Sequence, residues 1–259
     1  MKSIKQIFDL SGKVAIVTGG SMGIGYGIVE RLSEAGAKVV IADVSTVGSN
    51  KAANLRQQGR EVKFIKTDVS SEKDIRKLIS ETVKIYQRLD ILVNNAGIFP
   101  SKLVLDMDLA FWERTQAINL RGVFLGSREA AKVMVRQRRG SIINIASIDA
   151  LHPSMTGLAA YDASKHGVWG LTKNLALELG KKKVRVNAIA PGGIGTEGVA
   201  NMNPGKGGKV DLTAFTQKIP LGRFGTPDEI ALAVLFLASD ASSYMTGSIM
   251  VIDGGVLLS

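Results

Sequence analysis

The chain has 259 residues, among them 29 glycines, two histidines and no cysteine. The absence of cysteine excludes disulfide frameworks, thiolate nucleophiles, iron–sulfur clusters and zinc sites built on cysteine. Lys and Arg number 33 against 23 Asp and Glu, which gives a formal net charge of +10.

The positive charge raises the question of nucleic acid, because phosphates attract basic patches irrespective of sequence. The basic clusters are short, at residues 136–139 and 181–183, and each stands between a helical pattern and a strand pattern. Aromatic residues make up only 5% of the chain and do not alternate with these clusters, so base-stacking surfaces are not indicated. We interpret the clusters as solvated helix ends and expect no nucleic-acid partner.

The first residues, MKSIKQIFDLSGK, include basic side chains but no uninterrupted apolar stretch and no small-residue cleavage site. They therefore do not predict a secretory signal. No apolar run approaches the roughly 20 residues needed to cross a bilayer. We expect a cytoplasmic protein without a membrane partner.

Short runs of β-branched residues alternate with longer helical stretches along the whole chain. These runs are apolar on both faces, which is typical of a parallel sheet covered by helices on each side. The alternation predicts one α/β domain over residues 1–259, a doubly wound parallel sheet (Rossmann fold) with about seven strands. The strands are expected at residues 14–18, 39–42, 62–67, 91–94, 141–146, 185–190 and 249–252.

One segment departs in composition, GGIGTEGVANMNPGKGG at residues 192–208, which is rich in Gly, Asn and Pro. Its simplest interpretation is a long surface loop. The segment leaves the carboxyl end of a predicted strand, where loops of such folds carry ligands. A substrate lid over residues 193–215 is therefore the alternative.

The first predicted strand leads into a glycine-rich turn, TGGSMGIG, which opens an amphipathic helix. Gly19 allows a tight turn, Gly23 lets backbone N–H groups approach a pyrophosphate, and Gly25 lets helix and strand pack without an intervening Cβ. The phosphates would lie at the helix N-terminus, where free N–H groups and the helix dipole favour anions. The turn, which also contains Ser21, Met22 and Ile24, predicts a dinucleotide site.

Asp43 ends the second predicted strand, AKVVIAD, at the separation expected for the acid that binds an adenosine ribose. A carboxylate there accepts hydrogen bonds from the 2′- and 3′-hydroxyls and repels a 2′-phosphate. No Arg or Lys stands at positions 22, 44 or 45 to reverse that preference. The sequence thus predicts NAD rather than NADP, and the alternative is an ordinary aspartate that caps a turn.

Tyr161 and Lys165 are four positions apart in a stretch of helical periodicity and so share one helix face. A phenol with an ordinary pKa near 10 is a poor base, but an adjacent ammonium favours the phenolate and lowers that pKa. Such a pair can give or take a hydroxyl proton. By spacing alone, it is more often a solvated surface pair.

Together these features resemble the short-chain dehydrogenase/reductase family in its compact single-domain form. The resemblance covers almost the whole chain: a TGxxxGxG turn at 18–25, an NNAG element at 94–97, Ser147 with Tyr161xxxLys165, and a PGxxxT element at 191–196. Asn119 stands where the family has its fourth catalytic residue. The interval from Ser147 to Tyr161 is one residue longer than is commonest, so a pocket across 149–157 cannot be inferred from relatives.

The resemblance implies a role for each catalytic position. Tyr161 would be the general acid/base, and Lys165 would lower its pKa and hold the nicotinamide ribose. Ser147 would bind and polarise the substrate oxygen, and Asn119 would hold a water that links Lys165 to bulk solvent. The protein would place C4 of the nicotinamide against a carbinol carbon and manage the proton.

The resemblance also implies cofactor contacts beyond the glycine turn. Asp68 and Val69 would meet the adenine, and Ile194 and Thr196 the nicotinamide carboxamide. The further positions that it assigns to the cofactor are Asn95, Ala96, Gly97, Pro191 and Gly192, together with Tyr161 and Lys165.

The two histidines do not have ligand spacing and no HExxH is present, so no metal site is predicted. His152 lies in the loop after Ser147, where it contacts substrate or is an exposed loop residue. His166 points about 100° away from Lys165, toward packing or a subunit contact. Asp149 and His152, with the catalytic serine and tyrosine, suggest a polar substrate such as a sugar, polyol or hydroxyketone.

The C-terminal segment SIMVIDGGVLLS ends in apolar residues that a monomer would expose. The family resemblance implies a homotetramer, and a terminus buried between subunits would account for both.

The sequence therefore predicts an NAD(H)-dependent dehydrogenase that interconverts a secondary alcohol and a ketone. An enzymatic alternative is a 3-oxoacyl-(acyl-carrier-protein) type ketoreductase, whose acidic partner would suit the +10 charge but whose usual NADPH would suit Asp43 poorly. An alternative from another class is an NAD-sensing regulatory protein without turnover. The presence of Tyr161, Lys165 and Ser147 argues against it.

Overall fold

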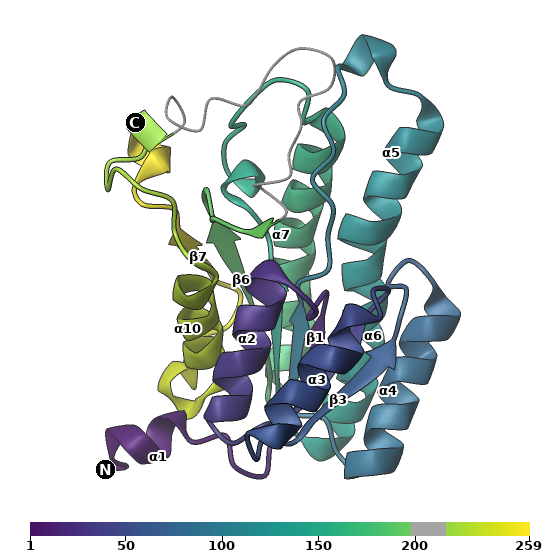
Figure 1. Cartoon of the computed structure of the whole chain (residues 1–259), viewed down its shortest axis with the longest axis vertical. Coiled ribbons are helices and arrows are strands. Elements are labelled where there is room, and N and C mark those ends of the chain that lie inside the picture. Colours follow the sequence, from purple (N-terminus) through teal and green to yellow (C-terminus); the bar gives the residue numbers. More distant parts are fainter. Residues whose placement is uncertain (198–215) are drawn as a thin grey trace.

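Seven parallel strands form one sheet, which Figure 1 shows with its covering helices. The computed structural model describes residues 1–197 and 216–259. The strand order is β3-β2-β1-β4-β5-β6-β7, which confirms the doubly wound Rossmann fold. The strands are β1 (Val14–Thr18), β2 (Lys38–Asp43), β3 (Val62–Lys66), β4 (Ile91–Asn94), β5 (Gly140–Ile145), β6 (Val184–Pro191) and β7 (Ile249–Ile252).

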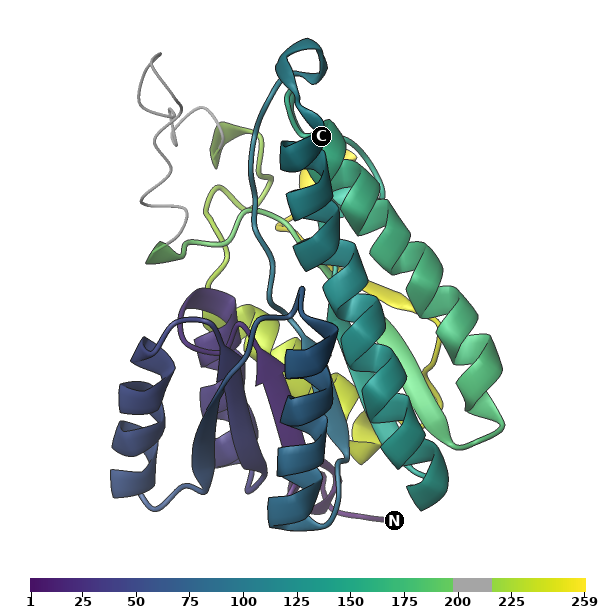
Figure 2. The same ribbon diagram turned by 90° about the vertical axis from the view of Figure 1, so that its right-hand side faces the viewer.

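Helices pack on both faces of the sheet (Figure 2). Neighbouring strand residues point to opposite faces, so Val17 enters the core on one side and Ile16 the core on the other. None of the described helices is long and apolar enough to cross a membrane. The first face is covered by α2 (Gly23–Glu34), α3 (Val47–Gln57) and α10 (Pro227–Ala238), and the second by α4 (Glu72–Tyr86), α6 (Gly122–Gln137) and α7 (Ala159–Gly180).

The predicted strands differ from the observed ones in detail. Their ends shift by one residue at β2, β3, β5 and β6. The prediction that both faces of each strand are apolar and covered was wrong for β3. Its Lys63 and Lys66 are exposed, because β3 is an edge strand. The opposite edge strand, β7, is likewise only partly buried. Of the predicted lid, residues 198–215 lie outside the described residues.

The strand order reverses at β1, which lies between β2 and β4. Ligands of open α/β sheets bind at such a reversal, beyond the carboxyl ends of the strands. Here Thr18 joins the ends of β1 and β4, since its hydroxyl accepts hydrogen bonds from the N–H groups of Asn95 and Ala96 at 3.0 and 3.1 Å. The Asn95 side chain in turn donates to the carbonyls of Thr18 and Gly19, both at 3.0 Å. The glycine turn is therefore fixed from the neighbouring strand.

A buried polar chain connects β4 and β5 to the helices of the second face. Asn94 donates to the Ser127 hydroxyl of α6 at 3.0 Å and to Asn144 of β5 at 2.8 Å. Asn144 donates in turn to the Thr172 hydroxyl of α7 at 2.9 Å. Each of these four side chains is buried with partners, as buried polar groups require. The chain fixes α7 against the centre of the sheet.

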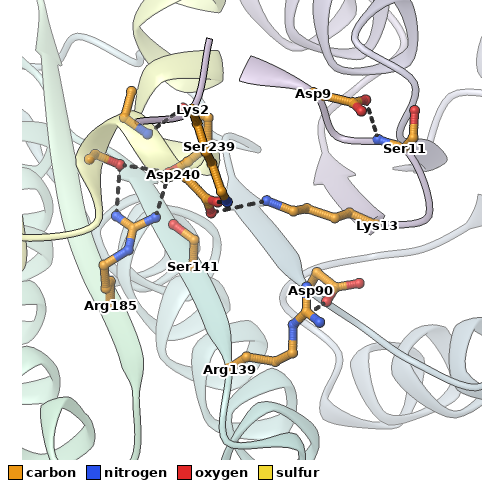
Figure 3. Close-up of polar contacts among 12 residues, drawn as sticks. Lys2, Asp9, Ser11, Lys13, Asp90, Arg139, Ser141, Arg185, Ser239 and Asp240 are labelled. Atoms are coloured by element: carbon orange, nitrogen blue, oxygen red, sulfur yellow. Dashed lines mark hydrogen bonds and ion pairs between the residues drawn. The ribbon is translucent and has the colours of Figure 1, made fainter. Parts of the chain in front are cut away.

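Charged side chains form ion pairs at the amino ends of the strands, the end of the sheet that lies away from the glycine turn (Figure 3). Asp90 is buried, and its carboxylate accepts from the Val14 N–H at 2.9 Å, from Arg88 at 2.7 and 2.8 Å, and pairs with Arg139 at 3.2 Å. Asp240 lies nearby but is half exposed, and it binds Lys2 and Lys13. The two aspartates thus differ in burial and in the backbone N–H that Asp90 also accepts.

We expect Asp90→Ala to lower the free energy of unfolding by about 2 kcal/mol, because it leaves a buried N–H and two guanidinium groups without their acceptor. Asp240→Ala is the matched control, and it should cost less than about 1 kcal/mol because exposed ion pairs contribute little. Urea unfolding followed by circular dichroism measures both. Equal losses for the two variants would contradict this account.

Candidate active site

Helix α7 begins two residues before Tyr161 and carries Tyr161 and Lys165 on one face. Lys165 is buried, and its Nζ donates to the Ile145 carbonyl at the end of β5 at 2.9 Å. The same Nζ lies 5.5 Å from the centre of the Tyr161 ring. Phe99 packs its edge against that ring, with 4.6 Å between ring centres and 83° between ring planes. The predicted shared face is therefore present, and the contact with Phe99 restrains the phenol ring.

Ser147 comes two residues after the end of β5 and caps a short 3₁₀ turn, Ile148–Ala150. Its hydroxyl donates to Oδ2 of Asp149 at 2.7 Å and accepts from the Asp149 N–H at 3.2 Å. Asp149 is buried, and its second oxygen accepts from the Ser154 N–H at 3.0 Å. The serine that sequence analysis places on the substrate oxygen is thus bound to a carboxylate.

Asn119 lies in a π-helical turn, Ala117–Arg121, between α5 (Leu109–Gln116) and α6. Its side chain accepts from the Ile98 N–H and donates to the Ile98 carbonyl, both at 2.8 Å, and donates to Ser164 of α7 at 3.3 Å. A Cβ at Gly97 would lie 3.3 Å from Asn119 Oδ1 and 3.8 Å from Lys165 Nζ, so glycine keeps this space open. The sequence did not indicate the π-turn, which often marks functional sites.

Burial governs ionisation at this site. Burial raises the pKa of the Tyr161 phenol, because the charged phenolate loses solvation. A hydrogen bond with Ser147 lowers this pKa in part, and the negative charges of Asp149 and Asp162 raise it further. Burial also lowers the pKa of Lys165 to about 8, against the opposing charge of Asp149. The expected lowering of the Tyr161 pKa by Lys165 is therefore not found in the protein alone, because desolvation of the phenolate dominates. Tyr161 is a proton donor in this state.

The glycine turn fits a bound dinucleotide. Gly19 has a φ of +62°, and a Cβ there would lie 2.8 Å from the Ala96 Cα. A Cβ at Gly25 would overlap the Gly19 carbonyl oxygen. Only glycine keeps the turn this close to the helix. The turn brings the backbone N–H groups of α2 to the carboxyl edge of the sheet, as phosphate binding requires.

Glu197 shows that this helix terminus attracts an anion. Its Oε2 accepts a hydrogen bond from the Gly23 N–H, the first residue of α2, at 3.2 Å. Thr196 lies beside it, close enough to contact a Cβ placed on Gly23. A pyrophosphate bound at this N-terminus would compete with the carboxylate for the Gly23 N–H. Sequence reasoning missed Glu197, which no motif marks.

Asp43 is half buried at the end of β2. Its two oxygens accept from the N–H groups of Ser21, at 3.1 Å, and Ser45, at 2.9 Å. Each carboxylate oxygen has a second acceptor site, so Asp43 can hold the turn and still accept from a ribose hydroxyl. The neighbouring Met22 side chain is exposed and uncharged. The two interpretations of Asp43 from sequence are compatible.

The remaining predicted cofactor positions lie in the segments that follow β3 and β6. Val69 is buried and Asp68 is exposed at the end of β3. Ile194 is buried and forms an isolated bridge with Gly225, and a Cβ on Gly192 would contact the Asp253 backbone. These contacts fix segment 191–196, and Thr196 at its end lies beside Gly23 of the glycine turn.

The predicted substrate residues differ in their exposure to solvent. His152 is exposed, with its ring Nδ1 2.9 Å from the Pro153 carbonyl, while Asp149 lies behind Ser147. His166 is exposed as well, so its predicted packing is wrong within the chain, and a subunit contact stays a prediction. Asp162, which the sequence analysis did not single out, has a buried Oδ1 without a hydrogen-bond partner. Among the described residues, no group of three metal-ligating side chains is present.

Comparisons with known proteins agree with this geometry. Residues 19–257 match the family described as enoyl-(acyl carrier protein) reductase. The 3-oxoacyl-[acyl-carrier-protein] reductase FabG of Aquifex aeolicus is 39% identical, over 95% of this chain and 98% of the relative. Tropinone reductase-like 1 of Erythroxylum coca is 44% identical, over 95% and 90%.

A solved structure from Beutenbergia cavernae superposes with a TM-score of 0.91 at 33% identity, covering 98% of this chain and all of the other. That protein is described as an NAD(P) dependent gluconate 5-dehydrogenase and has NADP bound at low occupancy. The chain belongs to the short-chain dehydrogenase/reductase family, in its classical form. It is an oxidoreductase that acts on CH–OH groups, and NAD(P) is the cofactor typical of this family.

Glu197→Ala should tighten binding of NADH about two- to fivefold, because the carboxylate competes with the pyrophosphate for the Gly23 N–H and repels it. Fluorescence titration with NADH measures the dissociation constant. Glu113→Ala, on the exposed surface of α5, removes the same charge away from the turn and should leave affinity unchanged. Weaker binding in the Glu197 variant would show that this side chain assists the cofactor.

Proposed function

We propose that the protein is an NAD(H)-dependent dehydrogenase that interconverts a secondary alcohol and a ketone. The observation that carries this proposal is the convergence of Tyr161, Lys165 and Ser147 at the carboxyl edge of the sheet, beside the glycine turn. Hydride transfer is the chemistry that the nicotinamide would supply when bound. The chain supplies the proton relay and the alignment.

In oxidation, Tyr161 takes the hydroxyl proton of the alcohol while the carbinol carbon gives its hydride to the nicotinamide. In reduction, Tyr161 returns a proton to the ketone oxygen. Lys165 is held rigidly by the Ile145 carbonyl, so it can bind the nicotinamide ribose and the Tyr161 oxygen from a fixed position. The Asn119 side chain is fixed by hydrogen bonds to the backbone N–H and carbonyl of Ile98 and to the Ser164 hydroxyl. These contacts support a relay from Tyr161 through Lys165 toward solvent.

The preference for NAD rests on Asp43. Its carboxylate lies where the adenosine ribose of a dinucleotide on the Gly19–Gly25 turn would come. A 2′-phosphate would be repelled, and the exposed side chain beside it is Met22 rather than a cation. The Beutenbergia cavernae relative has NADP bound at low occupancy, so the preference of this chain is a property to be measured.

A polar substrate suits the surroundings of Tyr161. His152 is exposed in the loop that follows Ser147, and Asp162 has a carboxylate oxygen without a partner next to Tyr161 in sequence. A sugar, polyol or hydroxyketone would provide hydroxyl groups for such side chains. The description of the Beutenbergia cavernae protein as a gluconate dehydrogenase points to the same class.

The second candidate is a ketoreductase that acts on acyl chains of an acidic carrier protein. The Aquifex aeolicus relative and the net charge of +10 favour it. Asp43 opposes it, because such reductases usually use NADPH. Comparison of NADH with NADPH in the reduction of an acyl thioester separates the two candidates.

We further infer that the active protein is a homotetramer with a buried C-terminus. Leu258 is 91% exposed in the single chain, and Leu177 on α7 is 81% exposed. Contiguous exposed apolar patches are typical of surfaces that another subunit covers, and we infer that each of these leucines belongs to such a surface. Light scattering after gel filtration measures the oligomeric state, and a monomer at micromolar concentration would contradict this inference.

Tyr161→Phe should reduce turnover about 10²- to 10⁴-fold, because the variant cannot transfer the hydroxyl proton. Its affinity for NADH should be nearly unchanged, since the phenol serves the proton and not the dinucleotide. Initial rates at 340 nm and a fluorescence titration measure the two quantities. Turnover close to that of the wild type would refute the role of Tyr161.

Asp43→Asn should weaken NAD binding about tenfold relative to NADP, because it removes the charge that favours the free ribose and repels the phosphate. The asparagine oxygen can accept from only one of the Ser21 and Ser45 N–H groups, so the turn keeps one of its two hydrogen bonds to this side chain. The ratio of kcat/KM for NAD and NADP is the readout. An unchanged ratio would show that the ribose lies elsewhere.

A further inference from the structure

The Ser147 hydroxyl is already committed on two sides. A serine hydroxyl has one proton to donate and two lone pairs to accept with. Its proton goes to Asp149 Oδ2 at 2.7 Å, and one lone pair accepts the Asp149 N–H at 3.2 Å. One lone pair is left for Tyr161 or for a substrate. With its proton on Asp149, Ser147 can accept a further hydrogen bond but not donate one, and an ionised Tyr161 competes with Asp149 for that proton.

Asp149 is built to keep that proton. It is 4% exposed, and its Oδ1 is held by the Ser154 N–H at 3.0 Å, so the carboxylate cannot rotate away without losing this bond. A carboxylate has no proton of its own to give and binds a donor more strongly than a neutral oxygen does. The charge also faces α7, where the side chains of Tyr161, Asp162 and Lys165 lie within its influence.

We propose that Asp149 is a positioning residue that holds the Ser147 hydroxyl as an acceptor and thereby favours the alcohol over the ketone as the bound substrate. The inference rests on the proposed dehydrogenase function. An alcohol has one hydroxyl proton: it can donate this proton to Ser147 Oγ while Tyr161 is neutral, and in the reacting complex the ionised Tyr161 takes it. A ketone has only acceptor lone pairs, so to bind Ser147 it must compete with Asp149 for the serine proton.

Asp149→Asn should reverse this hydrogen bond. The Ser154 N–H requires an acceptor, which keeps the asparagine oxygen at the Oδ1 position and turns Nδ2 toward Ser147. Nδ2 then donates to Ser147 Oγ, and the serine proton becomes free for the substrate oxygen. The single change from oxygen to nitrogen thus converts Ser147 from an acceptor into a donor with little change in side-chain volume.

The test compares a small diol with its hydroxyketone, butane-2,3-diol with NAD and acetoin with NADH. In Asp149→Asn we expect the KM for acetoin to fall and the KM for butane-2,3-diol to rise, each about tenfold, the factor of one hydrogen bond. The reaction equilibrium fixes the ratio of kcat/KM for oxidation to kcat/KM for reduction. The kcat of oxidation must therefore rise relative to the kcat of reduction when the two KM values change in this way. Equal loss in both directions, or no change in either, would overturn the proposal.

The pH profile gives a second readout. Removing the Asp149 charge and freeing the serine proton both favour the Tyr161 phenolate, which Asp162 and Asp149 now disfavour. Oxidation requires the phenolate, so its rate should reach half its maximum at a lower pH in the variant. A purely structural role for Asp149 would leave this midpoint unmoved, and that result would contradict the inference.

Two further variants complete the design. Asp149→Ala also frees the serine proton, so it should tighten acetoin binding in the same direction if the asparagine variant folds poorly. Thr156→Ala, in the same loop with an exposed side chain, is the matched control and should leave both KM values unchanged. A wild-type enzyme inactive with both probes and with every other secondary alcohol would refute the proposed function itself, whereas an active wild type with unaltered variants refutes only the role of Asp149.

Discussion

The site depends on the bond between the buried Lys165 amine and the Ile145 carbonyl, 2.9 Å long, which joins α7 to the end of β5. An amine without water around it must have such an acceptor, because a buried donor left unpaired is costly. The bond places Tyr161 one helical turn before the lysine, next to Ser147 at the end of the same strand. The Asn94, Asn144 and Thr172 chain fixes the helix against the sheet further along. The proposed proton transfer would therefore take place between groups held on rigid elements.

Much of the fold could be predicted from sequence because apolar runs of strand length alternated with helical periodicity throughout. The strands of the sheet centre obeyed this rule, since Ile16 and Val17 enter opposite cores. The rule failed at the edges, where Lys63 and Lys66 meet solvent, because the strand pattern does not state which strand lacks a neighbour. The ion pairs of Figure 3 could not be predicted either. Asp90 and Arg139 precede β4 and β5, and they meet because these two strands are neighbours in the sheet.

The site was predictable where fixed spacing carries the geometry, as for Tyr161 and Lys165 on one helix face and for Gly19, Gly23 and Gly25 in one turn. It was not predictable where contact is made across loops. Glu197 reaches the Gly23 N–H from 174 positions away, and the loop after Ser147 turns Asp149 inward to the serine. The direction of the Tyr161 pKa was also missed, because charge spacing is visible in a sequence and desolvation is not.

The measurement that tests the central claim most directly is absorbance at 340 nm with NAD, and separately with NADP, across sugars, polyols, hydroxy acids, steroids and simple secondary alcohols. The account predicts NADH formation with a polyol or sugar and much weaker activity with NADP. Activity confined to NADPH and acyl thioesters, measured in the reductive direction, would contradict it. That result would mean that Asp43 does not hold the ribose and that the carrier-protein ketoreductase is the better description.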